Sequence, residues 1–319
     1  MQTLIIDGLV FALPLFIMTI GGIYSEKSGV INLALEGLQG FGAFSGALAA
    51  TLIALNGGLS GELIYLLSLA CAMLGGALFS LLHAMLCIKF KANQVISGVV
   101  VNILAIALTS FLTRQINAVY FGKPSNKFIL NISSRMRLPG LADLPIIGFI
   151  FDNFYSFQLF IVILAIVAWY ALYRTRFGLH LRAAGENPHA LDAAGVGVNR
   201  IRTIAILVSG ALSGLAGISF AYSISANFST SIYAGYGFLA IAALIFGNWK
   251  IIPTLATCLL FGFAKAGGYE LIKALKMPNA YGDLIMTLPY VLTLVLLIFF
   301  SKHNRPPKAL GDIYDKGKR

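Results

Sequence analysis

The chain has 319 residues, of which 58% are hydrophobic and 11% charged, and its formal net charge is +11. About 25% of the residues in a soluble globular domain are charged, so this composition excludes that class and indicates a membrane protein. Membrane topology and anionic lipid headgroups account for the positive charge, and nothing in the chain indicates a nucleic-acid partner.

Apolar stretches close to the ~20 residues needed to cross the hydrocarbon recur along the whole chain. We predict an all-α, polytopic transmembrane helix bundle over residues 1–300, and a run of small residues at 209–217 indicates close helix packing. Short connections near Gly57 and Trp249 leave the count between eight and ten. Nine spans are expected, at residues 4–22, 30–54, 63–88, 94–115, 156–173, 203–225, 236–250, 251–275 and 283–300.

Lys and Arg residues set the expected orientation. If residues 301–319 form a basic cytoplasmic tail, nine spans place the N-terminus outside and 15 of the 23 basic residues inside. The positive-inside rule favours this distribution. The first span lacks the basic segment and cleavage site of a signal peptide, so we expect it to be retained. The external segment 116–155 contains basic residues together with Pro and Gly, which indicates a folded surface.

The second span contains Glu36, the acidic residue most clearly placed within a span. On a helix, Asn32, Glu36, Gln39, Ala43 and Gly46 step by 4, 3, 4 and 3 residues and form one stripe, polar and then small. A carboxylate at membrane depth is costly and faces the bundle interior or a wet cavity.

Two interpretations of Glu36 remain open. It gates a translocation path, or it hydrogen-bonds to irregular backbone of a helix that is broken near Gly37, Gly40 and Gly42. Other polar side chains within spans are weaker candidates for the same path, namely Asn93, Gln94, Asn102 and Asn248.

The stretch 174–202 is a polar island between two apolar runs. Asn187 can cap a helix, Pro188 suits its first position, and Gly195 suits the left-handed residue just past its end. This pattern predicts a seven-residue helix over 188–194, roughly 10 Å long at ~1.5 Å per residue. Because two turns are not stable alone in water, the helix either docks another protein or belongs to an ordinary connection between spans.

Motifs for catalysis or metal binding are missing from the sequence. It has no G-x-x-x-x-G-K-[ST] phosphate loop and no H-E-x-x-H, and Cys71, Cys87 and Cys258 stand singly in apolar spans. We therefore expect no catalytic residue, no metal site and no enzyme. Energy for uphill transport would come from an ion gradient or from a partner.

Five motifs occur in one order: GGIYSEKSGVINLALEG at 21–37, NQVISGVVVNILA at 93–105, AAGENPHALDAAGVGV at 183–198, VSGALSGLAG at 208–217 and GYGFLAIAALIFGNWKIIP at 235–253. Together they resemble the permease subunits of ABC importers for branched-chain amino acids, ribose-type sugars and nucleosides. The form SEKSGVINLALEG and the tail PPKALGDIYDKGKR are most similar to the nucleoside branch.

The resemblance implies that 183–198 contains a coupling helix that enters a groove of an ATPase subunit. It assigns ATPase contact to Gly185, Glu186, Asn187, Pro188, Ala193, Ala194 and Gly195, with His189 and Leu191 as further candidates. ATP and Mg²⁺ would bind to that ATPase, and this chain would hold no cofactor.

The resemblance also implies the other partners and the location. We expect a second permease subunit (a paralogue, giving a heterodimer), a substrate-binding lipoprotein on the outer face, a small neutral solute and the lipid bilayer. The bilayer would be the cytoplasmic (inner) membrane of a bacterium.

Three alternative transport functions remain open. The first is import of purine nucleosides, which are neutral; apart from Lys265, basic residues lie toward the membrane faces, which disfavours anionic substrates. The second is a ribose-type sugar permease. The third is an ion-coupled secondary transporter with Glu36 as the coupling carboxylate, whose expected paired half-sequence repeats are not visible.

Overall fold

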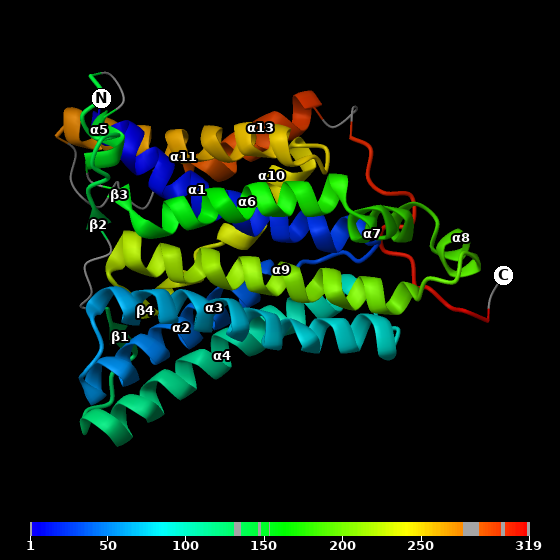
Figure 1. The fold of residues 1–319 in the computed structure, drawn as a ribbon, viewed down its shortest axis with the longest axis horizontal. Coiled ribbons are helices and arrows are strands. Elements are labelled where there is room, and N and C mark those ends of the chain that lie inside the picture. The colour runs from blue at the N-terminus through cyan, green and yellow to red at the C-terminus, as the bar shows by residue number, and fades with distance from the viewer. Residues whose placement is uncertain are drawn as a thin grey trace.

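The structure is a computed structural model that describes residues 2–130, 135–145, 148–152, 154–276, 287–300 and 304–317. Its long helices run side by side in one bundle (Figure 1), which confirms the predicted all-α, polytopic fold. Among the described residues, seven helices are long and apolar enough to cross a membrane: α1 (Gln2–Lys27), α2 (Leu35–Asn56), α3 (Gly61–Ala84), α4 (Gln94–Phe121), α6 (Ser156–Arg174), α9 (Val198–Phe220) and α11 (Ile251–Ala274). Two shorter apolar helices are α10 (Tyr236–Phe246) and α13 (Leu288–Phe300).

The two ends of the bundle differ (Figure 1). At the strand end, which includes the N-terminus, β1 (Lys127–Ile129) pairs with β4 (Asn227–Ser229), β2 (Arg135–Met136) pairs with β3 (Phe154–Tyr155), and a short helix, α5 (Gly148–Asp152), lies nearby. At the α8 end lie α7 (Arg176–Glu186), α8 (Pro188–Ala193) and the C-terminus. β1, β2, β3 and α5 lie within the predicted external segment 116–155.

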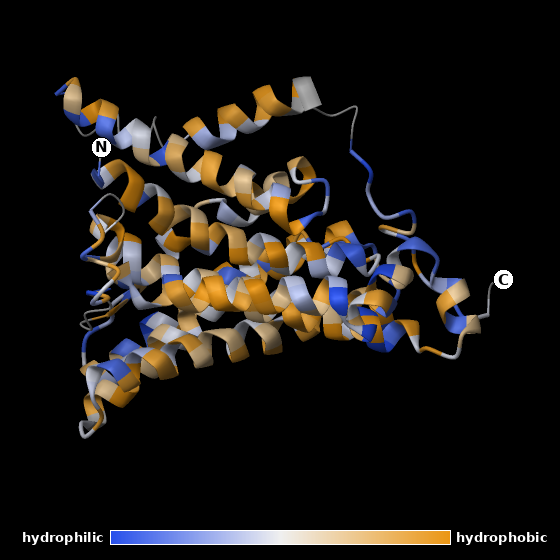
Figure 2. Ribbon diagram, turned by 45° about the horizontal axis from the view of Figure 1, so that its top comes forward, coloured by the Kyte–Doolittle hydropathy of each residue, from blue (hydrophilic) through white to orange (hydrophobic). Residues whose placement is uncertain are grey.

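Hydropathy follows the same division. Hydrophobic residues dominate the long helices, whereas hydrophilic residues gather at the strand end and the α8 end (Figure 2). This arrangement is the one expected when the middle of the bundle lies in hydrocarbon and its ends lie in water.

Two predicted spans are wrong as continuous helices. The second begins as a helix at Leu35, because Ser28–Ala34 is not helical, and α2 then continues through its glycines without a break. The seventh, predicted at 236–250, is an 11-residue helix of about 16 Å, which is too short to cross the hydrocarbon. Of the ninth, the structure describes α13, while 283–286 lie outside the described residues.

α9 is the most deeply buried of the long helices, and it packs against α1, α2 and α3. Its small residues allow the close approach: a Cβ atom added at Gly214 would overlap the Ala72 carbonyl of α3, and one added at Gly42 in α2 would overlap the Cα of Gly214. The glycines of α2 therefore serve contacts between helices, as small residues do in other membrane bundles. This result confirms the packing predicted for 209–217.

π-helical turns extend two of these helices. α3 continues through Met85–Lys89 toward the α8 end, and α9 continues through Ala221–Ser225 toward β4. After β4, a 3₁₀ turn at Thr230–Ile232 leads into α10. The chain between α9 and α10 thus departs from α-helical geometry.

Candidate functional site

The α1–α2 connection, Ser28–Ala34, is non-helical backbone enclosed by the bundle. Backbone groups at membrane depth need hydrogen-bond partners within the protein. Two side chains of α4 provide them: Gln94 Oε1 accepts from Ile31 N at 2.7 Å, and Asn102 Nδ2 donates to Leu33 O at 2.8 Å. These predicted path residues therefore hold the connection in place.

Two asparagines join this connection to the neighbouring helices. Asn102 Oδ1 also accepts from Gly37 N at 2.7 Å, in the first turn of α2. Asn32 Nδ2 donates to Ser209 Oγ of α9 at 2.9 Å, and Asn32 Oδ1 accepts from Ala34 N at 3.1 Å. Asn32 lies before α2, so the predicted helical stripe begins only at Glu36.

Glu36 holds the first turn of α10. Its carboxylate accepts from Gly235 N at 2.8 Å and from Gly237 N through a short hydrogen bond. An anion at a helix N-terminus is stabilised by the free N–H groups and by the helix dipole. Nearby, Gln39 Nε2 donates to Ile232 O at 3.3 Å. The Glu36 carboxylate therefore bonds to backbone at the start of another helix, and not to a break in α2.

Lys265 contacts the same turn from the other side. The side chain is 7% exposed, and Nζ donates to Tyr236 Oη at 2.8 Å. Nζ also lies 3.9 Å from the centroid of the Phe11 ring, close enough for a cation–π interaction. The first turn of α10 is therefore bonded to both a carboxylate and an ammonium group.

Two of the predicted path residues, Asn93 and Asn248, lie at the α8 end, away from Glu36 and Lys265. Asn93 is exposed and caps α4, with Oδ1 accepting from Val95 N at 2.9 Å and from Ile96 N at 3.1 Å. Asn248 follows α10, and its Oδ1 accepts from Arg305 N at 2.9 Å. Both side chains bind backbone close to themselves or in the C-terminal segment.

Some buried charged groups were missed by the sequence analysis. Glu26, 4% exposed, accepts from Trp249 Nε1 at 2.6 Å. This bond fixes the turn after α10, so α10 is held near both ends by carboxylates. Arg202, 3% exposed, lies in the first turns of α9. Both residues lie just outside the predicted spans, where charge ordinarily indicates a membrane face.

At the α8 end, the predicted caps of the short helix are confirmed. Asn187 Oδ1 accepts from Ala190 N at 3.0 Å, and Pro188 is the first helical residue. Gly195 has φ +81°, and Val196 N donates to Leu191 O at 3.2 Å in a Schellman-type ending. The helix has six residues, one fewer than predicted, because Ala194 is already its C-cap.

α8 is preceded by α7, an 11-residue amphipathic helix that the sequence analysis did not predict. α7 packs its small residues inward; a Cβ atom added at Gly185 would overlap the Lys27 carbonyl at the end of α1. Gly185, Pro188 and Leu191 are buried. The other predicted contact residues are exposed: Glu186, Asn187, His189, Ala193, Ala194 and Gly195.

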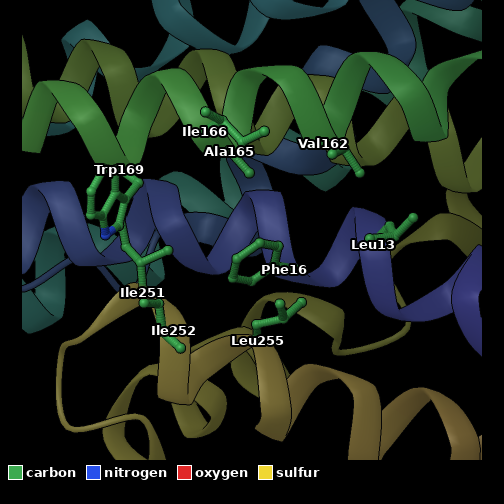
Figure 3. A pocket seen from close by; sticks show the side chains of 9 residues that line it. All are labelled: Leu13, Phe16, Val162, Ala165, Ile166, Trp169, Ile251, Ile252 and Leu255. Atoms are coloured by element: carbon green, nitrogen blue, oxygen red, sulfur yellow. The ribbon is translucent and has the colours of Figure 1, made fainter.

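A separate cleft of about 280 Å³ lies between α1, α6 and α11 (Figure 3). Its lining includes Leu13, Phe16, Ile166 and Leu255, and the Trp169 indole is its one polar side chain. A cleft with this lining suits hydrocarbon, such as a lipid chain, and offers a polar solute few hydrogen bonds.

Comparisons with known proteins give one family. The family described as branched-chain amino acid transport system / permease component matches residues 4–298. Over 98% of its length the chain is 39% identical to the guanosine ABC transporter permease protein NupQ of Bacillus subtilis (strain 168), of which it covers 96%.

Two further relatives extend this result. The nucleoside ABC transporter permease protein NupC of Lactococcus lactis subsp. cremoris (strain MG1363) is 37% identical over 100% of the chain and 98% of its own length. The guanosine ABC transporter permease protein NupP of Bacillus subtilis (strain 168) is 26% identical over 88% of the chain and 76% of its own length. No solved structure matches the chain. This multi-pass membrane protein therefore belongs to the family of branched-chain amino acid transport system permease components.

Proposed function

We propose that the chain is the membrane-spanning permease subunit of an ABC importer for purine nucleosides. The observation that carries the proposal is the full-length similarity to permeases named for guanosine and for nucleosides. The geometry supports the same role, because a short capped helix with an exposed outer face stands at one end of the bundle.

Three partners complete the proposed importer. An ATPase subunit binds ATP and Mg²⁺ and contacts the exposed face of α8. A binding lipoprotein delivers the solute at the opposite face. A second, paralogous permease pairs with this chain; the chain's similarity to both NupQ and NupP of one organism supports such a pair.

The orientation follows from basic residues. Basic residues at the α8 end include Lys27, Lys91, Arg176, Lys250 and Lys308. By the positive-inside rule, this end faces the cytoplasm of a bacterial cell, and the N-terminus and the strands face outward. An ATPase in the cytoplasm can then reach α8.

Coupling would run from α8 to α10 through packed contacts. α8 is joined to α7, and α7 packs on the end of α1 at Lys27. The α1–α2 connection follows at once, and Glu36 near its far end holds the first turn of α10. A displacement of α8 would therefore move the connection and α10 together.

Replacing Gly195 by Val tests the coupling role. Valine is strained at φ +81°, so the Schellman-type ending and the outer face of α8 should be disturbed. We expect normal amounts of permease in the membrane, at least tenfold lower uptake, and an ATPase no longer stimulated by loaded binding protein. Gly140→Val is the matched control, because Gly140 has φ +84° and open space around it at the strand end. Normal uptake by the Gly195 variant would remove the assignment.

Glu36 variants separate the importer from the ion-coupled carrier. In Glu36→Gln the side-chain oxygen still accepts one hydrogen bond, but the NH₂ group faces the second backbone N–H. That N–H loses its acceptor, which costs about 1–3 kcal/mol of stability. We expect Glu36→Gln to transport more slowly yet still depend on ATP, and Glu36→Leu to assemble poorly. Glu62→Gln, at an exposed position of α3, is the control. A carrier would show the opposite pattern: uptake abolished by an uncoupler, with Glu36→Gln retaining only downhill exchange.

Competition assays test the solute. In cells that carry the whole system, we expect unlabelled guanosine, adenosine and inosine to reduce uptake of labelled guanosine, while nucleotides, ribose and leucine do not. Nucleotides should not compete, because a phosphate needs a cationic partner and the buried Lys265 already donates to Tyr236 of α10. Inhibition by ribose or leucine without inhibition by nucleosides would show the substrate assignment to be wrong.

A further inference from the structure

The C-terminal segment Arg305–Asp315 is folded against the α8 end and runs beside α7 and α8 (Figure 1). Three of its backbone N–H groups donate hydrogen bonds to the residues after α10, to α7 and to the α1–α2 connection. They are Arg305 N to Asn248 Oδ1 at 2.9 Å, Ala309 N to Gly185 O at 2.8 Å, and Gly311 N to Gly29 O at 3.1 Å. The segment is thus fixed by its backbone, which leaves side chains free to face outward.

A buried guanidinium strengthens this attachment. Arg202 Nη1 donates to Asp312 O at 2.9 Å, and Arg202 Nε donates to Ser28 O at 3.1 Å. At the far end of the segment, Asp315 lies 2.9 Å from Lys91 Nζ. Through these two bonds Arg202 ties the segment to α9 and to the α1–α2 connection, while its Nη2 is buried without a hydrogen-bond partner among the described residues.

The segment and α8 enclose a shared hollow of about 440 Å³. α7 contributes Glu186, α8 and its cap contribute Asn187, Pro188 and His189, and the segment contributes Lys308, Ala309, Asp312, Ile313 and Tyr314. The two walls touch, since the rings of His189 and Tyr314 have their centroids 5.4 Å apart. A protein that contacts the exposed face of α8 therefore meets the C-terminal segment as well.

The lining of the hollow indicates what kind of partner fits. It combines acidic, basic and amide groups with an isoleucine, Ile313, that is 49% exposed. Such a mixture suits the surface of another protein and not a lipid chain. The proposed partner of α8 is the ATPase, and the hollow is continuous with α8.

We propose that Arg305–Asp315 is a second ATPase-docking element, which forms one surface with α8. This inference rests on the proposed function, because the occupant is the ATPase assigned to α8. In this arrangement the ATPase acts on α8 and, through Gly29 and Arg202, directly on the α1–α2 connection.

Ile313→Asp tests the proposal. Ile313 is half exposed, so the change should leave the permease folded with an unchanged Tm in detergent, while it places an unpaired charge on the docking surface. We expect the Kd for the purified ATPase subunit of the same system to rise at least tenfold, about 1.4 kcal/mol. Leu179→Asp is the matched control; Leu179 is 58% exposed on α7 and does not line the hollow. Its Kd should change less than twofold.

The outcomes separate this proposal from the function on which it rests. An unchanged Kd for Ile313→Asp, or an equal rise for Leu179→Asp, overturns the docking role of the segment. Gly195→Val is measured beside them. If Gly195→Val weakens binding and Ile313→Asp does not, α8 docks the ATPase alone and this proposal fails. If only Ile313→Asp weakens binding, the segment docks the ATPase and the assignment of α8 fails.

A photoreactive benzoylphenylalanine in place of Ile313 identifies the occupant in the assembled transporter. We expect irradiation to give a covalent adduct with the mass of permease plus ATPase, and nucleotide to change its yield. An adduct that contains only permease chains would assign the hollow to the permease pair and overturn the proposal.

Discussion

Non-helical backbone inside a membrane bundle must find its hydrogen bonds within the protein, and this constraint organises the structure. The chain leaves helical geometry within the bundle between α1 and α2 and again before α10. Backbone groups of the first break form hydrogen bonds with Gln94, Asn102 and Asn32. Those of the second break form hydrogen bonds with Glu36 and Gln39. Most polar side chains predicted to line a path therefore hold backbone in place, and the two breaks meet where Glu36 joins α2 to α10.

At the water-facing α8 end, backbone groups are again hydrogen-bonded within the protein. α7, the α1–α2 connection, α9 and the C-terminal segment are joined through Gly185, Gly29 and Arg202. These contacts are backbone hydrogen bonds and a buried guanidinium, which resist separation more than exposed ion pairs do. In the proposed importer, this network turns the contact with an ATPase into movement of the connection on which α10 depends.

The sequence predicted those elements that depend on interactions between residues close together in the chain. The caps at Asn187 and Gly195 act within one helix, and hydropathy marks every long span, so both were visible without a structure. The break at Ser28–Ala34 was not, because hydropathy cannot distinguish an apolar helix from apolar backbone held by distant side chains. The residues around Arg202 and those of the C-terminal segment have the composition of ordinary loops. Arg202 is buried because it bonds to Asp312, which is far away in the sequence.

In the proposed importer, nucleotide binding at the α8 end moves the α1–α2 connection and α10 as one unit. Hydrogen–deuterium exchange on the complete transporter, with and without a non-hydrolysable ATP analogue, measures this most directly. The account predicts that peptides covering 28–37 and 233–240 change their exchange together, while those of the interior of α6 do not. Exchange that changes in α7 and α8 alone, with 28–37 and 233–240 unaffected, would contradict it.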